Sequence, residues 1–227
     1  LNPASVFGGT EYYVNQSHPQ AGDRNPGTEQ LPLRTIQQAA AIAKPGDVVL
    51  VKPGAYEERV RVMKSGAAGA AIIFSGSPGA ITRGFDIQGD YIQVSGFEVA
   101  NTNSGHWRDG AGIVVVGNFC EVKKNYIHDV TRVGILLHAD PPDSPATSDC
   151  LVAENRIERA GLAGIVISGR NHLVEGNEIS RSVQYPPSWT NPPEWVDADG
   201  MRFFGSGHTI RKNYIHDILL TDPGNID

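Results

Sequence analysis

The chain has 227 residues, of which 40% are hydrophobic and 19% are charged, with 19 basic and 25 acidic side chains. This length allows one domain with a sizeable core, and the hydrophobic content excludes a disordered chain. The net charge of −6, without any run of Lys or Arg, argues against a nucleic acid as partner. No apolar run approaches the roughly 18 residues of a membrane span, so no membrane-spanning helix is expected.

The clearest helical periodicity comes early, in Thr35-Ile-Gln-Gln-Ala-Ala-Ala-Ile-Ala, where Ile36, Ala39, Ala40 and Ala43 share one face. Short β-type runs follow this stretch, at residues 48–51, 60–62, 71–74 and 85–87. Because the open end of a stack of strands exposes unpaired edges, we expect residues 1–46 to form an N-terminal segment whose helix caps that end.

An Asn-x-Ile triplet recurs along the rest of the chain, with Ser95-Gly-Phe interpreted as a degenerate first copy. Its four clear copies begin at Asn125, Asn155, Asn177 and Asn213. Successive copies begin 30, 30, 22 and 36 residues apart, which indicates a unit of 22 residues with loops of 8, 8, 0 and 14 residues inserted. Each unit also carries a Gly followed by apolar residues, at Gly112, Gly134, Gly164 and Gly200.

A unit with two or three short β-type runs is too short for a strand-helix-strand crossover, and it predicts one rung of a parallel β-helix. We expect the asparagines to form a column at a turn, with left-handed backbone angles and amides hydrogen-bonded along the axis. The rungs are predicted to fill residues 47–227 of a single domain, 1–227, and to continue beyond Asp227. The residues predicted to stack inward as the core are Phe97, Ile127, Ile157, Ile179 and Ile215.

Several N-terminal stretches resemble the opening of right-handed parallel β-helix proteins related to pectate and alginate lyases. They are Tyr12-Tyr-Val-Asn, Asn25-Pro-Gly-Thr, Pro32-Leu-Arg-Thr-Ile-Gln-Gln-Ala, Pro45-Gly-Asp-Val-Val and Pro53-Gly-Ala-Tyr. The resemblance implies an all-β, right-handed parallel β-helix and an extracellular or cell-surface protein that acts on a polysaccharide. Glycoside hydrolases, epimerases and non-catalytic surface proteins begin with the same kind of stretches, so the resemblance does not decide between a lyase, another enzyme and a non-catalytic protein.

Two inserted loops, residues 101–110 and 183–199, leave the coil between the same two markers and are therefore expected to project from one side. With rungs about 4.8 Å apart, loops three rungs apart stand roughly 14 Å from each other and wall a cleft. All three tryptophans, Trp107, Trp189 and Trp195, fall in these loops, with Tyr185 beside two of them. Their rings either stack on sugar faces or anchor their own loops.

Four arginines near the floor of this cleft are candidates for binding the carboxylates of a uronic-acid polymer through paired hydrogen bonds. They are Arg108, Arg132, Arg159 and Arg181. The alternative is a ladder of opposite charges on a solvated face, in which each pair contributes little.

A calcium site is predicted from the acidic residues toward the C-terminus, Asp197, Asp199, Asp222 and Asp227. Ala198-Asp199-Gly200 is similar to the calcium site of some β-helical pectate lyases, which implies that Asp199 is a ligand. In those enzymes the catalytic Lys comes from later rungs, which this chain does not contain, so Arg202 is the substitute. The alternative is a set of solvated turn aspartates.

His138 is a second candidate for a general base, although a surface histidine is the simpler interpretation. Cys120 and Cys150 occupy the same place in adjacent rungs, as a buried apolar pair or as a disulfide.

Three functions remain as hypotheses. The first is a polysaccharide lyase that performs metal-assisted β-elimination on a uronic-acid-containing polymer. The second is a glycoside hydrolase with paired carboxylates, such as Asp197 with Asp199 or Asp217. The third is a non-catalytic carbohydrate-binding or structural module. The outward apolar column Val114, Leu136 and Val166 favours it, because an exposed aliphatic stripe indicates a covering partner, such as other copies in a trimer.

Overall fold

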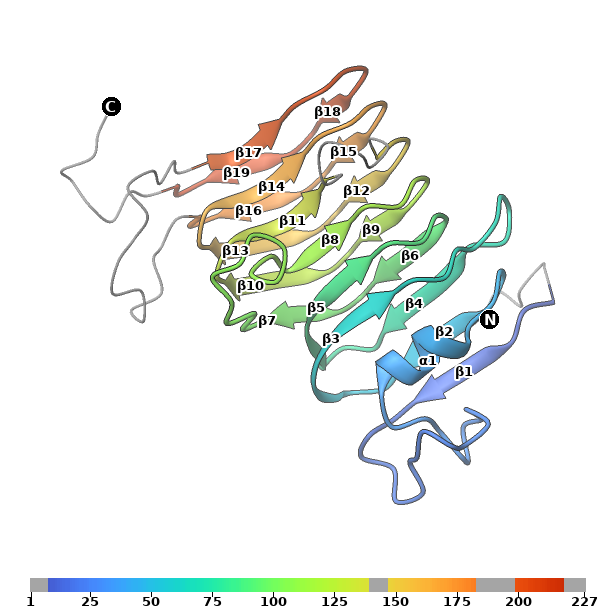
Figure 1. Cartoon of the computed structure of the whole chain (residues 1–227). Helices are drawn as coiled ribbons and strands as arrows, with labels where there is room; N and C mark the ends of the chain where they lie inside the picture. Colours follow the sequence, from blue (N-terminus) through green and yellow to red (C-terminus); the bar gives the residue numbers. More distant parts are fainter. Residues whose placement is uncertain (1–7, 139–146, 183–198, 219–227) are drawn as a thin grey trace.

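The computed structural model describes residues 8–138, 147–182 and 199–218, which form a solenoid of parallel strands with one short helix near its N-terminal end (Figure 1). Each strand pairs in parallel with its counterpart in the neighbouring rung, so the strands stack along one axis. The predicted parallel β-helix is therefore confirmed.

One sheet makes the first face of the solenoid. In spatial order its strands are β1 (Glu11–Val14), β2 (Val48–Val51), β4 (Ile72–Gly76), β6 (Ile92–Ser95), β9 (Glu121–Lys123), β12 (Leu151–Ala153), β15 (Leu173–Glu175) and β18 (Thr209–Arg211).

The other sheet bends around a corner and makes two more faces. The long strand β5 (Ala80–Ile87) pairs with β3 (Gly54–Val62) and contributes to both faces. The second face holds β7 (Glu98–Ala100), β10 (Tyr126–Val130), β13 (Arg156–Ala160), β16 (Glu178–Ser180) and β19 (Tyr214–His216). The third face holds β8 (Ile113–Val115), β11 (Val133–Leu137), β14 (Ala163–Ile167) and β17 (Asp199–Phe203).

Helix α1 (Ile36–Ile42) lies where the sequence predicts a helix, beside the first strands (Figure 1). Thr35 is its N-cap, and the Thr35 side chain accepts a hydrogen bond from the backbone N–H of Gln38. The Glu58 carboxylate accepts two more, from the N–H groups of Ile36 and Gln37 at 2.8 and 2.9 Å. These bonds fix the helix start against β3, while the role of α1 as a cap stays a prediction.

The asparagines form a continuous hydrogen-bonded column, the asparagine ladder, at the corner between the first and second faces. The side-chain oxygen of Asn155 accepts from both the backbone N–H and the amide of Asn125, at 3.1 and 3.0 Å. Asn177 accepts the same two bonds from Asn155, and Asn213 accepts them from Asn177. Each side-chain amide also donates to a carbonyl one rung back, as Asn155 does to Val122 at 2.9 Å.

The left-handed residues at this corner are the ones that precede the asparagines, which corrects the prediction. Their φ angles are 56° at Lys124, 54° at Glu154, 64° at Gly176 and 57° at Lys212. The asparagines are needed for their side chains, because the amide supplies a donor and an acceptor at once for backbone groups of the neighbouring rung.

The register of the first unit also differs from the prediction by two residues. Ile127 pairs with Val99 rather than with Phe97, and Val122 pairs with Val94. Phe97 therefore occupies the place of an asparagine, and its backbone N–H donates to the Asn125 side chain at 3.0 Å. Of the other predicted members of the inward column, Ile127, Ile157 and Ile179 are in register and buried, whereas Ile215 is in register with Ile179 but 43% exposed.

The outward apolar column on the third face is buried, so it is not the exposed stripe predicted from the sequence. Val114, Leu136 and Val166 form a second hydrophobic cluster, and the partly buried Trp107 packs against it. The loop at residues 101–110 thus folds down over the third face. Cys120 and Cys150 are free thiols in the main core.

Candidate functional site

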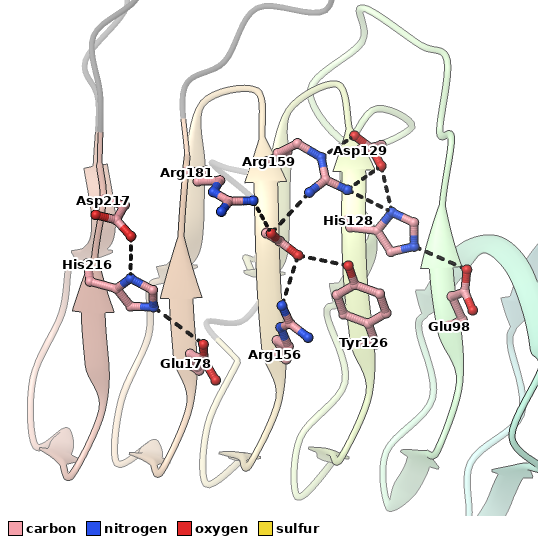
Figure 2. Close-up of polar contacts among 11 residues, drawn as sticks. Glu98, Tyr126, His128, Asp129, Arg156, Arg159, Glu178, Arg181, His216 and Asp217 are labelled. Carbon is pink, nitrogen blue, oxygen red and sulfur yellow. Dashed lines mark hydrogen bonds and ion pairs between the residues drawn. The ribbon is translucent and has the colours of Figure 1, made fainter.

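The outward side chains of the second face form a dense polar cluster, which we call the charged face (Figure 2). The strands β7, β10, β13, β16 and β19 lie in register, so side chains of successive rungs stand beside one another. Adjacent side chains on one face of a sheet interact directly when they are paired in this way.

Glu158 on β13 is the centre of the charged face, and its side chain is only 6% exposed. Its carboxylate accepts hydrogen bonds from the Tyr126 hydroxyl and from Arg181, both at 2.8 Å. It also pairs with Arg159 at 3.1 Å and with Arg156 at 3.3 Å. The Tyr126 hydrogen bond and then the three guanidinium groups hold the pKa of Glu158 below its usual range. The carboxylate is therefore charged and orients three arginines, which Figure 2 labels.

Asp129 binds Arg159 through two parallel hydrogen bonds, at 2.6 and 2.7 Å. It also accepts a hydrogen bond from His128 at 2.6 Å. These contacts, chiefly the hydrogen bonds from Arg159, lower the pKa of Asp129 from 3.8 to about 2. They raise the pKa of the Arg159 guanidinium. Arg159 is thus held between two carboxylates, whereas Arg181 and Arg156 are more exposed.

This lowered pKa predicts a pH dependence of stability. A carboxyl group with a depressed folded-state pKa stabilises the fold above its unfolded-state pKa, near 3.8, and this contribution disappears as the pH falls through about 2. We expect Asp129→Asn to lower the free energy of unfolding at pH 6 by about 1 kcal/mol, a figure reduced for solvent screening because the side chain is 43% exposed. The difference from the unmodified protein should vanish near pH 2 in urea titrations.

Asp217 provides the matched control, because it also follows a histidine but is 63% exposed and contacts His216 rather than an arginine. Asp217→Asn should change stability by less than about 0.5 kcal/mol across the same pH range. Equal effects of the two substitutions would contradict the importance of Arg159.

The tetrapeptide Tyr-Ile-His-Asp occurs twice on the charged face, at residues 126–129 and 214–217. In both copies the histidine bridges two carboxylates: His128 lies between Asp129 and Glu98, and His216 between Asp217 and Glu178. Each imidazole stacks on the tyrosine of its own copy, with ring centroids 4.4 and 4.5 Å apart. The carboxylates, Asp217 first, raise the pKa of His216.

Arg108 and Arg132, the two other arginines predicted to bind substrate, make contacts that join the loop at residues 101–110 to the solenoid. Arg108 pairs with Asp86 at 2.9 Å, and Arg132 donates two hydrogen bonds to the Gly105 carbonyl at 2.9 and 2.7 Å. Arg59 on β3 adds bonds to the carbonyls of Ala111 and Arg108, at 2.6 and 2.9 Å. These contacts fasten the loop to the solenoid, and a substrate-binding role for Arg108, Arg132 and Trp107 stays a prediction.

The two predicted catalytic residues lie with the third face, apart from the arginines of the second face. Arg202 on β17 forms an ion pair with Asp199. His138 follows β11, is half-buried, and donates its backbone N–H to Val115. The structure therefore does not bring these two residues together with Arg159 and Arg181 on one strand face.

Within the described ranges, no group of three or more His, Cys, Asp or Glu side chains is arranged to hold a metal ion. Asp199 is the one predicted ligand in these ranges, and its carboxylate is already paired with Arg202. Asp197, Asp222 and Asp227 lie outside the described residues, as do Tyr185, Trp189 and Trp195. The calcium site stays a prediction.

The sequence predicts Arg159 and Arg181 as binding residues but does not single out Glu158, Tyr126 or Arg156, which complete the cluster. The repeated Tyr-Ile-His-Asp tetrapeptide is the signal that could have found the site, because it lies directly after two asparagines of the ladder.

Among the described residues, no helix has the length and apolar character that a membrane span needs.

Comparisons with solved structures show which known folds this solenoid shares. It superposes on 92% of its length with the structure of XylC in complex with xylose, at 14% identity and a TM-score of 0.73, and covers 59% of that chain. It matches pectate lyase Pel9A over 90% of its length, at 18% identity and a TM-score of 0.61, and covers 62% of that chain. The chain has a pectate lyase-like β-helix fold.

Three further comparisons concern another solved structure, a family and a relative in sequence. A GH136 lacto-N-biosidase from Eubacterium ramulus matches 94% of this chain at 18% identity and a TM-score of 0.67, with 53% of that chain covered. Residues 20–62 match the family described as protein of unknown function (DUF1565). The uncharacterized protein YwoF of Bacillus subtilis (strain 168) is 31% identical over 83 residues, 37% of this chain and 16% of YwoF. The chain thus spans less than two thirds of these proteins.

Proposed function

We propose that this β-helix belongs to a carbohydrate-active extracellular protein, a polysaccharide lyase that binds a uronic-acid polymer along the charged face. The observation that carries the proposal is the set of three arginines oriented by Glu158. Guanidinium groups fixed in this way match carboxylates bidentately, and two of them, Arg156 and Arg181, are more than half exposed on adjacent rungs. The shared fold with a pectate lyase supports the same substrate class.

In β-elimination an enzyme neutralises the uronate carboxylate, removes the adjacent proton and protonates the leaving oxygen. Arg181 would receive the carboxylate, because it keeps exposed donors while one Nη1 bond to Glu158 holds it in place. Arg202 and His138, the bases predicted from the sequence, lie with the third face, apart from Arg181, so the role that the charged face supports is binding of the polymer. A bound Ca²⁺ would assist by neutralising carboxylate charge. Because Asp199 pairs with Arg202, no step of the proposal depends on the metal.

The hydrolase alternative has one observation in its favour. An imidazole with a carboxylate hydrogen-bonded at each nitrogen separates the two carboxylates by a distance within the ~5–9 Å that glycosidases use. Glu98 with Asp129, and Glu178 with Asp217, are such pairs. The matching lacto-N-biosidase supports the same reading.

Product analysis on polygalacturonate, alginate and chondroitin sulfate, with and without Ca²⁺, tests the proposal. Unsaturated uronate, detected by its ultraviolet absorbance, is the expected product. New reducing ends without that absorbance would contradict the lyase and support the glycoside hydrolase. Binding without any cleavage would leave a non-catalytic carbohydrate-binding module, and the absence of binding to every uronate polymer would overturn the use of the charged face.

Arg181→Gln should weaken binding to the uronate polymer that binds best by about tenfold, because the exposed guanidinium is lost. Stability should change little, since Glu158 keeps Tyr126, Arg156 and Arg159. Arg211→Gln is the matched control: Arg211 is equally exposed but pairs with Glu175 on the first face, at 2.7 Å. Affinity electrophoresis compares the polymer affinities of the two variants. An equal loss of affinity in both would show that only the net charge matters and would contradict a specific role of Arg181.

A further inference from the structure

The corner between the third and first faces carries one left-handed residue in every rung. The column, with φ angles from 53° to 72°, is Tyr91, Phe119, Asp149, Asn171 and Gly207. Gly, Asn and Asp are the residues that adopt this conformation most readily, whereas a bulky aromatic residue is unfavourable there. The last three members follow this preference and the first two do not. The fold itself therefore does not require aromatic residues at this corner.

Tyr91 and Phe119 form a flat aromatic pair, in which Phe119 is exposed and Tyr91 is half-buried. Their rings stack with centroids 4.8 Å apart and planes within 8°, so Tyr91 covers one side of Phe119. The column continues with Asp149, which has no ring, and 46% of Phe119 is exposed. An exposed ring in an unfavourable backbone conformation is the kind of departure from local preference that marks functional positions.

Carboxylates and amides surround the pair. Asp90 accepts hydrogen bonds from the backbone and side chain of Asn118, at 2.7 and 3.1 Å, directly before Phe119. On the next rung the Asp149 carboxylate accepts from the Asn171 amide at 3.3 Å, which leaves it further acceptor capacity. An apolar ring flanked by acceptors matches a pyranose, whose C–H face is apolar and whose rim carries hydroxyl donors. Two aspartates also disfavour an acidic sugar.

We propose that Tyr91 and Phe119 form a platform that binds neutral sugar units of a polysaccharide. This site lies on a different corner from the charged face and goes beyond the proposed function. Phe119 supplies the stacking surface, Tyr91 supports its ring from behind, and the carboxylates of Asp90 and Asp149 accept hydrogen bonds from the sugar hydroxyls.

Phe119→Asn tests the platform, because it replaces the ring by a residue suited to the left-handed conformation. Affinity electrophoresis in gels that contain xylan, galactomannan or hydroxyethyl cellulose should show retardation of the unmodified protein by at least one polymer. Phe119→Asn should weaken that binding about tenfold while the melting temperature stays equal or rises. Phe119→Tyr should retain binding. Phe203→Asn, which removes another exposed phenylalanine, should bind normally.

Three results would overturn the proposal: no retardation by any neutral polymer, unchanged binding by Phe119→Asn, or a lower melting temperature for that variant. The last would show that the ring stabilises the fold. Arg181→Gln should bind neutral polymers normally, and Phe119→Asn should bind polygalacturonate as the unmodified protein does. These two variants therefore test the platform and the charged face separately.

Discussion

Asn155→Ala should lower the free energy of unfolding by about 4 kcal/mol, the largest effect we expect from one substitution. The side chain is 1% exposed and takes part in four hydrogen bonds of the ladder, two as acceptor and two as donor. Its removal leaves the Asn125 N–H groups and the Val122 carbonyl without partners inside the solenoid, and each unsatisfied buried group costs about 1–3 kcal/mol. Urea unfolding followed by circular dichroism measures the loss.

Asn15→Ala serves as control for the loss of an asparagine. The Asn15 side chain accepts one exposed hydrogen bond, from the backbone N–H of Ser17 at 3.2 Å. Its replacement should cost less than about 1 kcal/mol. Comparable losses at the two positions would mean that the ladder stabilises the solenoid no more than an ordinary turn does.

Glu158→Gln should destabilise the protein by about 2 kcal/mol, because three guanidinium groups then lie together without their shared carboxylate. Removal of one partner from a buried ion pair costs about 3–5 kcal/mol, and water reaches the exposed ends of Arg156 and Arg181, which reduces this figure. Addition of Arg181→Gln should restore part of the lost stability by relieving the repulsion.

Glu178→Gln is the corresponding control on the next strand. Glu178 is more exposed than Glu158 and pairs with His216 alone among the charged-face residues of Figure 2. We expect a change below about 0.5 kcal/mol. A double variant of Glu158 and Arg181 that is less stable than Glu158→Gln alone would contradict the clustering of positive charge.

The rung length could be predicted from the sequence because backbone packing restricts two columns to single residue types. The asparagines satisfy buried backbone groups, and a Cβ at Gly134 would lie 2.5 Å from the carbonyl oxygen of Gly164 in the next rung. The register of the first unit was predicted wrongly because Phe97 stands in the place of an asparagine there, so the marker is absent.

The charged face could be predicted only in part. Arg159 and Arg181 follow from their place after the triplet, but the burial of Glu158 depends on side chains from three strands that the sequence does not bring together. The outward apolar column was misjudged for a similar reason. The loop that covers it is held by Arg59, whose hydrogen bond to the Arg108 carbonyl joins residues 49 positions apart.

The asparagine ladder is directional: each side-chain oxygen accepts from the preceding rung, and the amides of Asn155 and Asn177 donate both back to that rung and forward to the next asparagine. Each rung is therefore clamped by the one that follows it. Loss of one asparagine therefore frees the donors of the rung before it and leaves the donors of the rung after it bound. In Asn155→Ala, amide hydrogen exchange should accordingly speed up at Asn125, whose N–H loses its acceptor, and stay slow at Asn177, whose N–H still donates to Asn213.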